Sequence, residues 1–341
     1  MKRWTWIAGE VAIVVAMVML AALANVAADG PETAVKPRSV TKVYADGRHN
    51  MNTAFVRWQD RYWLAFRTGS KHASPDGATV VLVSSDGKKW DNVHGIDSPL
   101  DERDVQLVAT PKRLFLYIPV VERAPGKGIA VVTYVTTTDD GTTWSKLAQV
   151  YETQFVLWRP FLHEGRFWAT AYKPAARGKR VLDLVRSDDG LKWEKIATMR
   201  QGHSETETTL QFVAGGRLLA FHRDAGRTNG FLMSAKAPYT EWDEPRPLPV
   251  MLNGQSAYTF DGVHYLISRT IRREDKKEFV GTMIYTFDAD GKLTPYCKLP
   301  ASGDCAYANA IRVGDEMWVS YHSAHEGTAN IYLARVPLQG K

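Results

Sequence analysis

The sequence predicts an all-β protein that folds as one six-bladed β-propeller. Pairs of short apolar runs, each pair joined by a polar turn, recur about every 50 residues along the chain. A second kind of turn with a fixed motif recurs at a similar interval, and no amphipathic helical pattern of useful length follows residue 30. Because one propeller blade contains four strands, a repeat of this length corresponds to one blade.

The first hairpin shows the features that predict strands. Residues Ala54–Trp58 and Tyr62–Phe66 are apolar and flank the polar turn Gln59–Arg61. The runs are short and rich in β-branched and aromatic side chains, which is typical of strands. The pattern recurs around five later turns, at Lys112, Gly165, Gly215, Gly262 and Gly314. The six hairpins therefore predict six blades.

Both ends of the chain are expected to share the last blade. The final pair of apolar runs, Met317–Tyr321 and Ile331–Val336, is long. We infer that a strand over residues 39–45 pairs with it and closes the ring. Residues 29–341 then form a single propeller domain.

A second turn carries a motif of Ser or Thr, Asp, Gly and Trp at fixed spacing. Its three copies are Ser85–Trp90, Thr138–Trp144 and Ser187–Trp193, and Ala237–Trp242 is an eroded fourth copy. The aspartate accepts backbone N–H bonds in the turn, the glycine adopts a positive φ, and the tryptophan packs between sheets. The motif is therefore structural.

The first 28 residues have the features of a secretory signal peptide. Lys2 and Arg3 supply positive charge, Val11–Ala24 is apolar, and small residues follow. The apolar run is shorter than the roughly 20 residues that a spanning helix needs. We expect a secreted or periplasmic protein that is free of the membrane after cleavage. In such a compartment Cys297 and Cys305 could form a disulfide, the alternative being two unrelated buried thiols.

Composition and charge exclude several classes of function. The chain has 43 basic and 37 acidic residues, a net charge of +6, and these charges are scattered rather than clustered. We therefore expect no nucleic-acid partner, although a mildly basic surface suits an acidic glycan. Two cysteines exclude a multi-cysteine zinc site, and the sequence has no phosphate loop, dinucleotide fingerprint or His-Glu-x-x-His motif. We expect a monomer that uses no metal and no cofactor.

The Ser/Thr-x-Asp-Gly-x-x-Trp turn resembles the Asp-box of the sialidase (neuraminidase) superfamily, whose members are six-bladed β-propellers. The resemblance extends over roughly residues 44–337. Three further stretches look like a bacterial sialidase-like or exo-α-sialidase group: Trp63–Arg67, Glu207–Leu210 and Ser320–Gly327. The resemblance implies an exported glycoside hydrolase that releases terminal acidic sugars such as sialic acid.

The same resemblance assigns roles to individual residues. Tyr307 matches the family's nucleophilic tyrosine, Glu207 its neighbouring base, and Asp76 the general acid/base. A neutral tyrosine suits a sugar whose anomeric carbon bears a carboxylate, because a carboxylate nucleophile would be repelled there. Arginines bind that carboxylate through paired hydrogen bonds. The matching substrate-binding arginines are Arg67, Arg223 and Arg269.

One departure from the family pattern concerns the first clamp arginine. Met51 stands where that arginine is expected, and Arg48 or Arg57 are the nearby substitutes. Two other functions therefore stay open. A lyase or atypical glycosidase acting on uronate-containing glycans would use a tyrosine with a histidine. A glycan-binding propeller would use the pocket without catalysis.

Several polar residues outside the motif have two interpretations each. The histidines are either turn and packing residues or lyase groups; they are His49, His72, His322 and His325. The acidic stretch Asp101–Asp104 is either a solvated loop or the rim of the pocket on the second blade. In the second case Arg103 and Asp104 would face the ligand.

Overall fold

The computed structural model describes residues 33, 35–98, 100–124, 128–174, 178–226, 229–274 and 277–340. The predicted signal peptide, residues 1–28, lies outside these ranges. Within them, no helix has both the length and the apolar character needed to cross a lipid bilayer.

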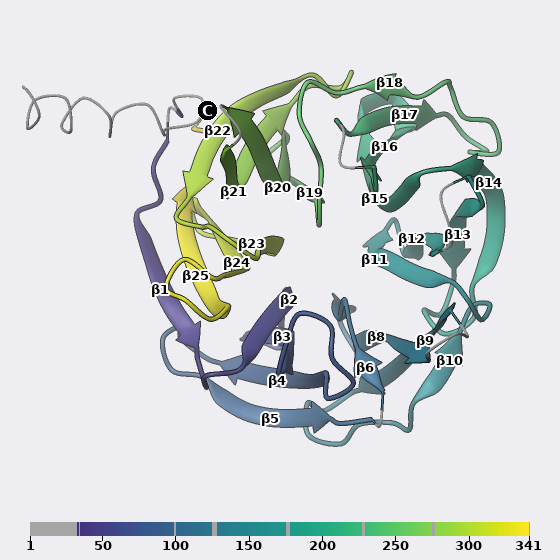
Figure 1. Cartoon of the computed structure of the whole chain (residues 1–341). Helices are drawn as coiled ribbons and strands as arrows, with labels where there is room; N and C mark the ends of the chain where they lie inside the picture. The colour runs from purple at the N-terminus through teal and green to yellow at the C-terminus, as the bar shows by residue number, and fades with distance from the viewer. Residues whose placement is uncertain are drawn as a thin grey trace, which may run out of the picture. The chain divides into compact units, whose positions relative to one another are not determined.

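Six antiparallel sheets surround a central axis, as the view along that axis shows (Figure 1). The first blade contains β2 (His49–Trp58), β3 (Arg61–Gly69), β4 (Ala78–Ser84) and β5 (Asp91–Ile96). The second contains β6 (Asp101–Glu102), β7 (Gln106–Ala109), β8 (Leu114–Ala124), β9 (Gly128–Thr138) and β10 (Ala148–Val150). The third contains β11 (Val156–His163), β12 (Arg166–Lys173), β13 (Arg180–Ser187) and β14 (Glu194–His203).

The remaining three blades repeat this order. The fourth contains β15 (Glu205–Val213), the 3-10 turn η1 (Ala214–Gly216), β16 (Arg217–Asp224), β17 (Phe231–Ala235) and β18 (Arg246–Pro247). The fifth contains β19 (Ser256–Phe260), β20 (Val263–Glu274), β21 (Lys277–Phe287) and β22 (Leu293–Leu299). The sixth contains β23 (Cys305–Val313), β24 (Glu316–Ser323), β25 (Asn330–Pro337) and, from the other end of the chain, β1 (Ser39–Tyr44). The predicted all-β, six-bladed propeller is confirmed.

The ring is closed by the pairing of β1 with β25. The two strands are antiparallel, with Ser39 opposite Arg335 and Tyr44 opposite Ile331. Just before β1, Arg38 forms exposed ion pairs with Asp315 and Glu316. The N-terminal strand expected over residues 39–45 is therefore present and completes the last blade.

The hydrophobic core lies between neighbouring blades. Among the described residues, the buried apolar side chains form six clusters, each centred on the interface between two neighbouring blades. The cluster between the first and sixth blades, for example, contains Leu64 and Phe66 together with Trp318 and Leu333. Since every blade packs on two others, no blade has a core of its own.

The repeated Ser/Thr-Asp-Gly turns join neighbouring blades as well. In the second copy, Asp140 Oδ1 accepts the N–H groups of Thr142 and Thr143, each at 2.7 Å. Gly141 has a φ of +78°, and a Cβ atom there would lie 2.7 Å from the ring of Trp63 in the preceding blade. The glycine is thus required both by the backbone and by the packing between blades.

Of the two interpretations that the sequence left open for the cysteines, the structure shows two separate thiols. Cys297 and Cys305 are both free and buried. Cys297 lies in β22 of the fifth blade, whereas Cys305 begins β23 of the sixth, so the short segment between them crosses from one sheet to the next. Both thiols are buried, and this burial raises the pKa of each.

Replacing Gly141 with alanine should lower the free energy of unfolding by about 2–4 kcal/mol, because a left-handed backbone and a contact with Trp63 both disfavour the methyl group. Gly165 is a matched control, since its φ is +77° and nothing lies within 4 Å of the added Cβ. G165A should lose only about 1–2 kcal/mol. Urea unfolding measures both values, and equal losses would contradict the packing role of Gly141.

Candidate active site

Bulges in the inner strands aim side chains at the axis of the ring. The strand pairing shifts register near the start of β2, β11, β15 and β23. Residues inside these bulges include Asn52, Arg159, Glu207 and Tyr307, of which all but Glu207 have positive φ. A bulge re-directs the side chain that it carries, and it is common beside active sites. The candidate site therefore consists of residues at irregular positions in otherwise regular strands.

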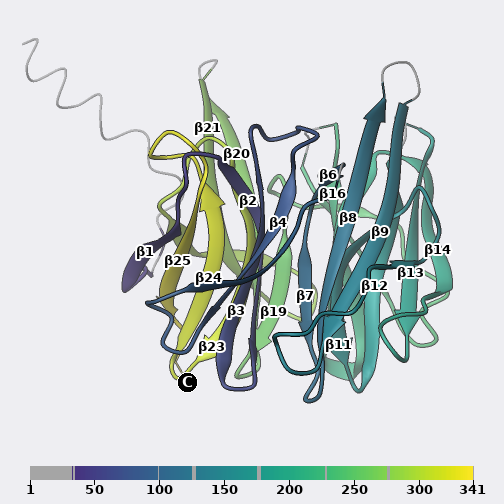
Figure 2. The same ribbon diagram turned by 90° about the horizontal axis from the view of Figure 1, so that it is seen from below.

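All the inner strands begin at the same end of the ring, because each is the first strand of its blade. The hairpins that join the second and third strands lie at this end too. Figure 2 shows that two of them, β8–β9 and β20–β21, extend beyond the neighbouring strands. Tyr307 and Glu207 lie near the starts of β23 and β15, so they belong to this end of the channel.

Tyr307 and Glu207 form a buried hydrogen-bonded pair. Tyr307 Oη donates to Glu207 Oε1 at 2.9 Å, and Asn253 Oδ1 lies 3.1 Å from the same hydroxyl. Glu207 Oε2 accepts the N–H of Gly254 at 2.8 Å, and Arg223 forms an ion pair with Oε1. A Cβ at position 254 would lie 2.5 Å from the tyrosine ring, so only glycine fits there.

The surroundings of Tyr307 hold its hydroxyl protonated. Burial raises the pKa of Tyr307, and the negative charge of Glu207 raises it further, while Arg223 and Arg269 act in the opposite direction. Ionisation of the phenol therefore requires its proton to pass to a nearby acceptor. Glu207 is placed to be that acceptor, because its carboxylate already holds the hydroxyl hydrogen.

Arg269 contacts the ring of Tyr307. Its Cζ atom is 5.3 Å from the ring centroid, its Nε donates to the carbonyl of Cys305 at 2.8 Å, and its Nη2 donates to Asp304 Oδ1 at 2.6 Å. The guanidinium thus combines a cation–π contact with an ion pair. Arg223 and Arg269 flank Tyr307, as the sequence predicts, and each already has a carboxylate partner.

Three histidines surround Asp304. His49 Nε2 lies 3.0 Å from Oδ2, His72 Nδ1 bonds the same oxygen, and His322 Nε2 lies 3.4 Å from Oδ1. Burial raises the pKa of Asp304, but the hydrogen bonds from these histidines, His322 foremost, outweigh it and lower the pKa well below the usual range. Asp304 is therefore an anion that organises the histidines beside Arg269.

The ligand atoms of His49, His72 and Asp304 lie within 4.8 Å of one another, a spacing that could hold a metal ion. The hydrogen bonding favours a different use. Arg103 Nη2 lies 3.2 Å from His72 Nε2, and a guanidinium can only donate, so that nitrogen accepts and Nδ1 carries the hydrogen shared with Asp304. With two guanidinium groups beside it, the cluster fits a proton-sharing network better than a cation site.

The position of the expected first clamp arginine is filled by a packing residue. Met51 is fully buried. Neither suggested substitute has a contact with Tyr307: Arg48 pairs with Asp76 at 3.0 Å, and Arg57 pairs with Asp60 at 3.0 Å near the far end of β2. The basic groups on this side of the site are His49 and His72 beside Asp304. Arg103, which contacts His72, is a further arginine within electrostatic range of Tyr307.

Arg67 was expected to bind substrate, but its guanidinium has other partners. It is fully buried, and its guanidinium is held by Asp101 at 2.7 Å, by the carbonyl of Lys71 at 3.0 Å and by Ser74. These bonds tie the loop after β3 to the second blade. The structure therefore does not bring Arg67 together with Arg223 and Arg269.

Asp76 also lies apart from the Tyr307–Glu207 pair. Its side chain is 45% exposed, and it accepts bonds from the N–H of Ser70 at 3.0 Å and from Arg48 at 3.0 Å. Hydrogen bonds from Ser74 and Ser70 lower the pKa of Asp76. This carboxyl is thus held in its charged form, which does not favour proton donation.

Asp104 differs from Asp76 because its pKa is raised rather than lowered. Burial raises the pKa of Asp104, and the charge of Glu207 raises it too, against the effect of Arg103. Its φ is +45°, Asn52 Nδ2 donates to its Oδ1, and part of the residue is exposed. The sequence allowed two interpretations of Asp101–Asp104, a solvated loop or the rim of the pocket. The contacts of Asp104 support the pocket rim.

Comparisons with known proteins support this picture of the fold. A family model described as "BNR repeat-like domain" matches residues 103–280. A crystal structure of a protein of unknown function from Dyadobacter fermentans has a TM-score of 0.75 and 17% identity, covering 89% of this chain and 99% of that one. No curated protein sequence matches the chain.

Sialidases of known structure share the architecture at low identity. Trypanosoma rangeli sialidase in complex with 2,3-difluorosialic acid, described as a covalent intermediate, has a TM-score of 0.63 and 11% identity over 90% of this chain and 58% of that one. The Hadza microbial sialidase Hz136 has a TM-score of 0.65 and 15% identity over 85% and 66%. The chain thus spans less than two thirds of the length of these sialidases. The likeness shows that this chain and these sialidases share the propeller fold.

Replacing Arg67 with methionine should lower the free energy of unfolding by about 2–3 kcal/mol, because buried Asp101 would lose its closer partner and keep only Arg103 at 3.4 Å. Arg113 is the control, since its ion pair with Asp139 is exposed and R113M should lose at most about 1 kcal/mol. Chemical denaturation measures both. If R67M kept full stability and lost only ligand affinity, Arg67 would be a binding residue instead.

Proposed function

Since this chain belongs to the BNR repeat-like domain family, we propose that it is a glycoside hydrolase that removes a terminal acidic sugar from a glycan, with Tyr307 as nucleophile. One observation carries the proposal: the buried 2.9 Å hydrogen bond between Tyr307 Oη and Glu207 Oε1, flanked by Arg223 and Arg269. The covalent intermediate described for the Trypanosoma rangeli enzyme supports the same reaction type.

In the first step, Tyr307 Oη bonds to the anomeric carbon as the bond from that carbon to the leaving oxygen breaks. The phenolic proton passes to Glu207 Oε1, and a carboxylic acid protonates the leaving oxygen. In the second step, water displaces the tyrosine, loses a proton to the carboxylate formed in the first step, and Glu207 returns its proton to Tyr307. The sugar carboxylate would lie toward Arg223 and Arg269. These two arginines would balance the charge of the sugar carboxylate and of Glu207.

The acid that protonates the leaving oxygen is best assigned to Asp104. A proton donor is effective when its pKa is high enough to keep the proton at the working pH, and the pKa of Asp104 is raised whereas that of Asp76 is lowered. Asp104 also lies within electrostatic range of Tyr307 and Glu207. Asp76, the assignment implied by the sequence resemblance, is the alternative.

Replacing Tyr307 with phenylalanine should lower kcat on a sialylated oligosaccharide by at least about a thousandfold while leaving the fold intact, because only the nucleophilic oxygen is lost. Product release is followed by mass spectrometry, and thermal unfolding checks the fold. Tyr321→Phe serves as a matched control, since its hydroxyl bonds the carbonyl of Pro300 away from Glu207. Full hydrolysis by Y307F would exclude the tyrosine nucleophile.

Replacing Asp104 with asparagine should lower kcat by about 10²–10⁴-fold on an oligosaccharide, yet by much less on an aryl glycoside whose leaving group needs no proton. Because the pKa of Asp104 is raised, the wild-type rate should fall as the pH rises through that pKa, when the proton is lost, and D104N should lack this fall. D76N is the paired variant and should behave like wild type. The reverse result would return the acid/base role to Asp76.

A second function, a uronate lyase, is favoured by the histidine cluster. The Tyr307 and His322 rings have centroids 5.8 Å apart, and Met51 stands in place of a clamp arginine. A lyase would release an unsaturated sugar without adding water, so the product mass separates the two reactions. No product from sialosides or uronates, combined with measurable affinity, would instead indicate a glycan-binding propeller.

A further inference from the structure

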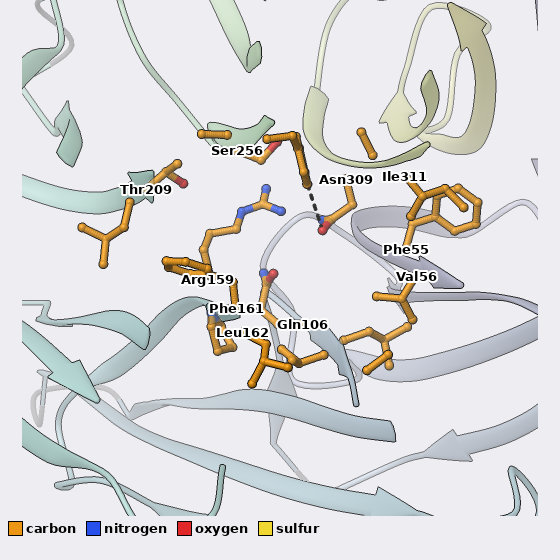
Figure 3. Close-up of a pocket in the computed structure, with 18 of the residues that line it drawn as sticks. Phe55, Val56, Gln106, Arg159, Phe161, Leu162, Thr209, Ser256, Asn309 and Ile311 are labelled. Carbon is orange, nitrogen blue, oxygen red and sulfur yellow. Dashed lines mark hydrogen bonds between the residues drawn. The ribbon is translucent and has the colours of Figure 1, made fainter. Parts of the chain in front are cut away.

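The second halves of the inner strands line a cavity of about 420 Å³ around the axis of the ring. The residues that line it follow the bulges of β2, β11, β15 and β23, so it lies farther along the channel than the Tyr307–Glu207 pair. Figure 3 shows side chains from several blades converging there. We call it the lower-channel site, and the argument uses Val56, Gln106, Arg159, Leu162, Ser256 and Asn309.

The cavity carries positive charge and no negative charge. Its lining includes Arg57 and Arg159 but no aspartate or glutamate. Arg57 is half-exposed and already paired with Asp60 at 3.0 Å. Arg159, by contrast, is only 9% exposed and has no carboxylate within 4.0 Å among the described residues. The acidic groups that act on Arg159, Glu207 and Asp104, do so only at longer range. A buried cation without a direct ion pair is costly.

The guanidinium of Arg159 is also short of hydrogen bonds. Its Nη2 donates to the carbonyl of Gly254 at 3.1 Å, whereas Nε and Nη1 are buried without any partner. The hydroxyl of Ser256 is buried and unpaired in the same region. Burial lowers the pKa of Arg159, while the charges of Glu207 and Asp104 act in the opposite direction. Two residues with unpaired polar atoms therefore line one cavity, although those atoms are themselves covered.

The backbone directs this side chain into the channel. Arg159 lies in the bulge of β11 with a φ of +50°, a region that costs free energy for any residue but glycine. Figure 3 shows its guanidinium reaching from β11 toward Ser256 and Asn309, with Gln106 nearby. A strained backbone that places an unpaired cation in a cavity indicates a binding role rather than a packing one.

We propose that the lower-channel site binds a small organic carboxylate, with the carboxylate on Arg159 and a short apolar body against the walls toward Val56 and Leu162. The charge of Arg159 selects an anion, and the polar ring of Gln106, Ser256 and Asn309 offers further hydrogen bonds. The apolar walls select a carbon body over a bare inorganic ion. Because Nε and Nη1 of Arg159 are covered, binding requires the guanidinium to turn toward the ligand. This proposal is independent of the reaction at Tyr307.

Calorimetric titration of the full chain with acetate, propionate and butyrate tests the proposal, with sodium chloride at equal ionic strength as the inorganic probe. Affinity should increase by up to about fourfold for each added methylene, because each one buries apolar surface. Chloride should bind more weakly than butyrate. Chloride binding as tight as butyrate binding, or no carboxylate binding at all, would overturn the proposal.

Arg159→Met should abolish butyrate binding, since it keeps the length of the side chain and removes the charge. R269M is the matched control: it removes an arginine beside Tyr307, at the other part of the channel, and should keep butyrate binding. Retained binding in R159M with loss in R269M would assign the carboxylate to the Tyr307 site instead.

A second variant keeps the test decisive if R159M does not fold. Leu162 is 37% exposed and lines the cavity, so Leu162→Glu places a negative charge at its wall with little effect on the core. L162E should weaken butyrate binding at least tenfold while thermal unfolding in plain buffer stays near that of wild type. Unchanged butyrate affinity in L162E would contradict binding in this cavity.

Discussion

The closure of the ring by β1 and β25 is the constraint on which the rest of the structure depends. Each blade buries its apolar faces only against its two neighbours, so six interfaces must form together and the last one joins the sixth blade to the first. Once closed, the ring fixes the distances among six inner strands that come from distant parts of the sequence. Tyr307, Glu207 and Asp104 meet because of this constraint, although about 100 residues separate each from the next.

Local irregularities in the inner strands place polar residues of the candidate site. Regular strands would send alternate side chains to the two faces of each sheet, whereas the bulges in four inner strands turn chosen residues toward the axis. Arginines of the second strands pair with carboxylates around the site: Arg223 with Glu207, Arg269 with Asp304, and Arg67 with Asp101. Arg159, which lies in a bulge, differs from them, since its guanidinium has no carboxylate partner within 4.0 Å among the described residues.

Repeats in the sequence were sufficient to predict the blades, because each hairpin and each Asp-Gly turn is determined by residues close together in the chain. The pairing of Tyr307 with Glu207 was instead implied by the resemblance to the sialidase superfamily. Asp304, Asn253 and Gly254 were missed because their roles arise from contacts between blades, which spacing along one strand does not report. Arg67 was expected in the pocket for a similar reason: a motif identifies a residue type but not the buried Asp101 that binds it.

Closure by the two ends has a consequence for how the protein is made. Ser39 pairs with Arg335, so the outer strand of the final blade, β1, is synthesised first and has no partner until β25 has left the ribosome. Early blades emerge with one apolar face uncovered, and such faces are prone to associate with other chains. The native ring can therefore form only after β25 has been synthesised. A chain that stays unfolded until then loses nothing by the delay.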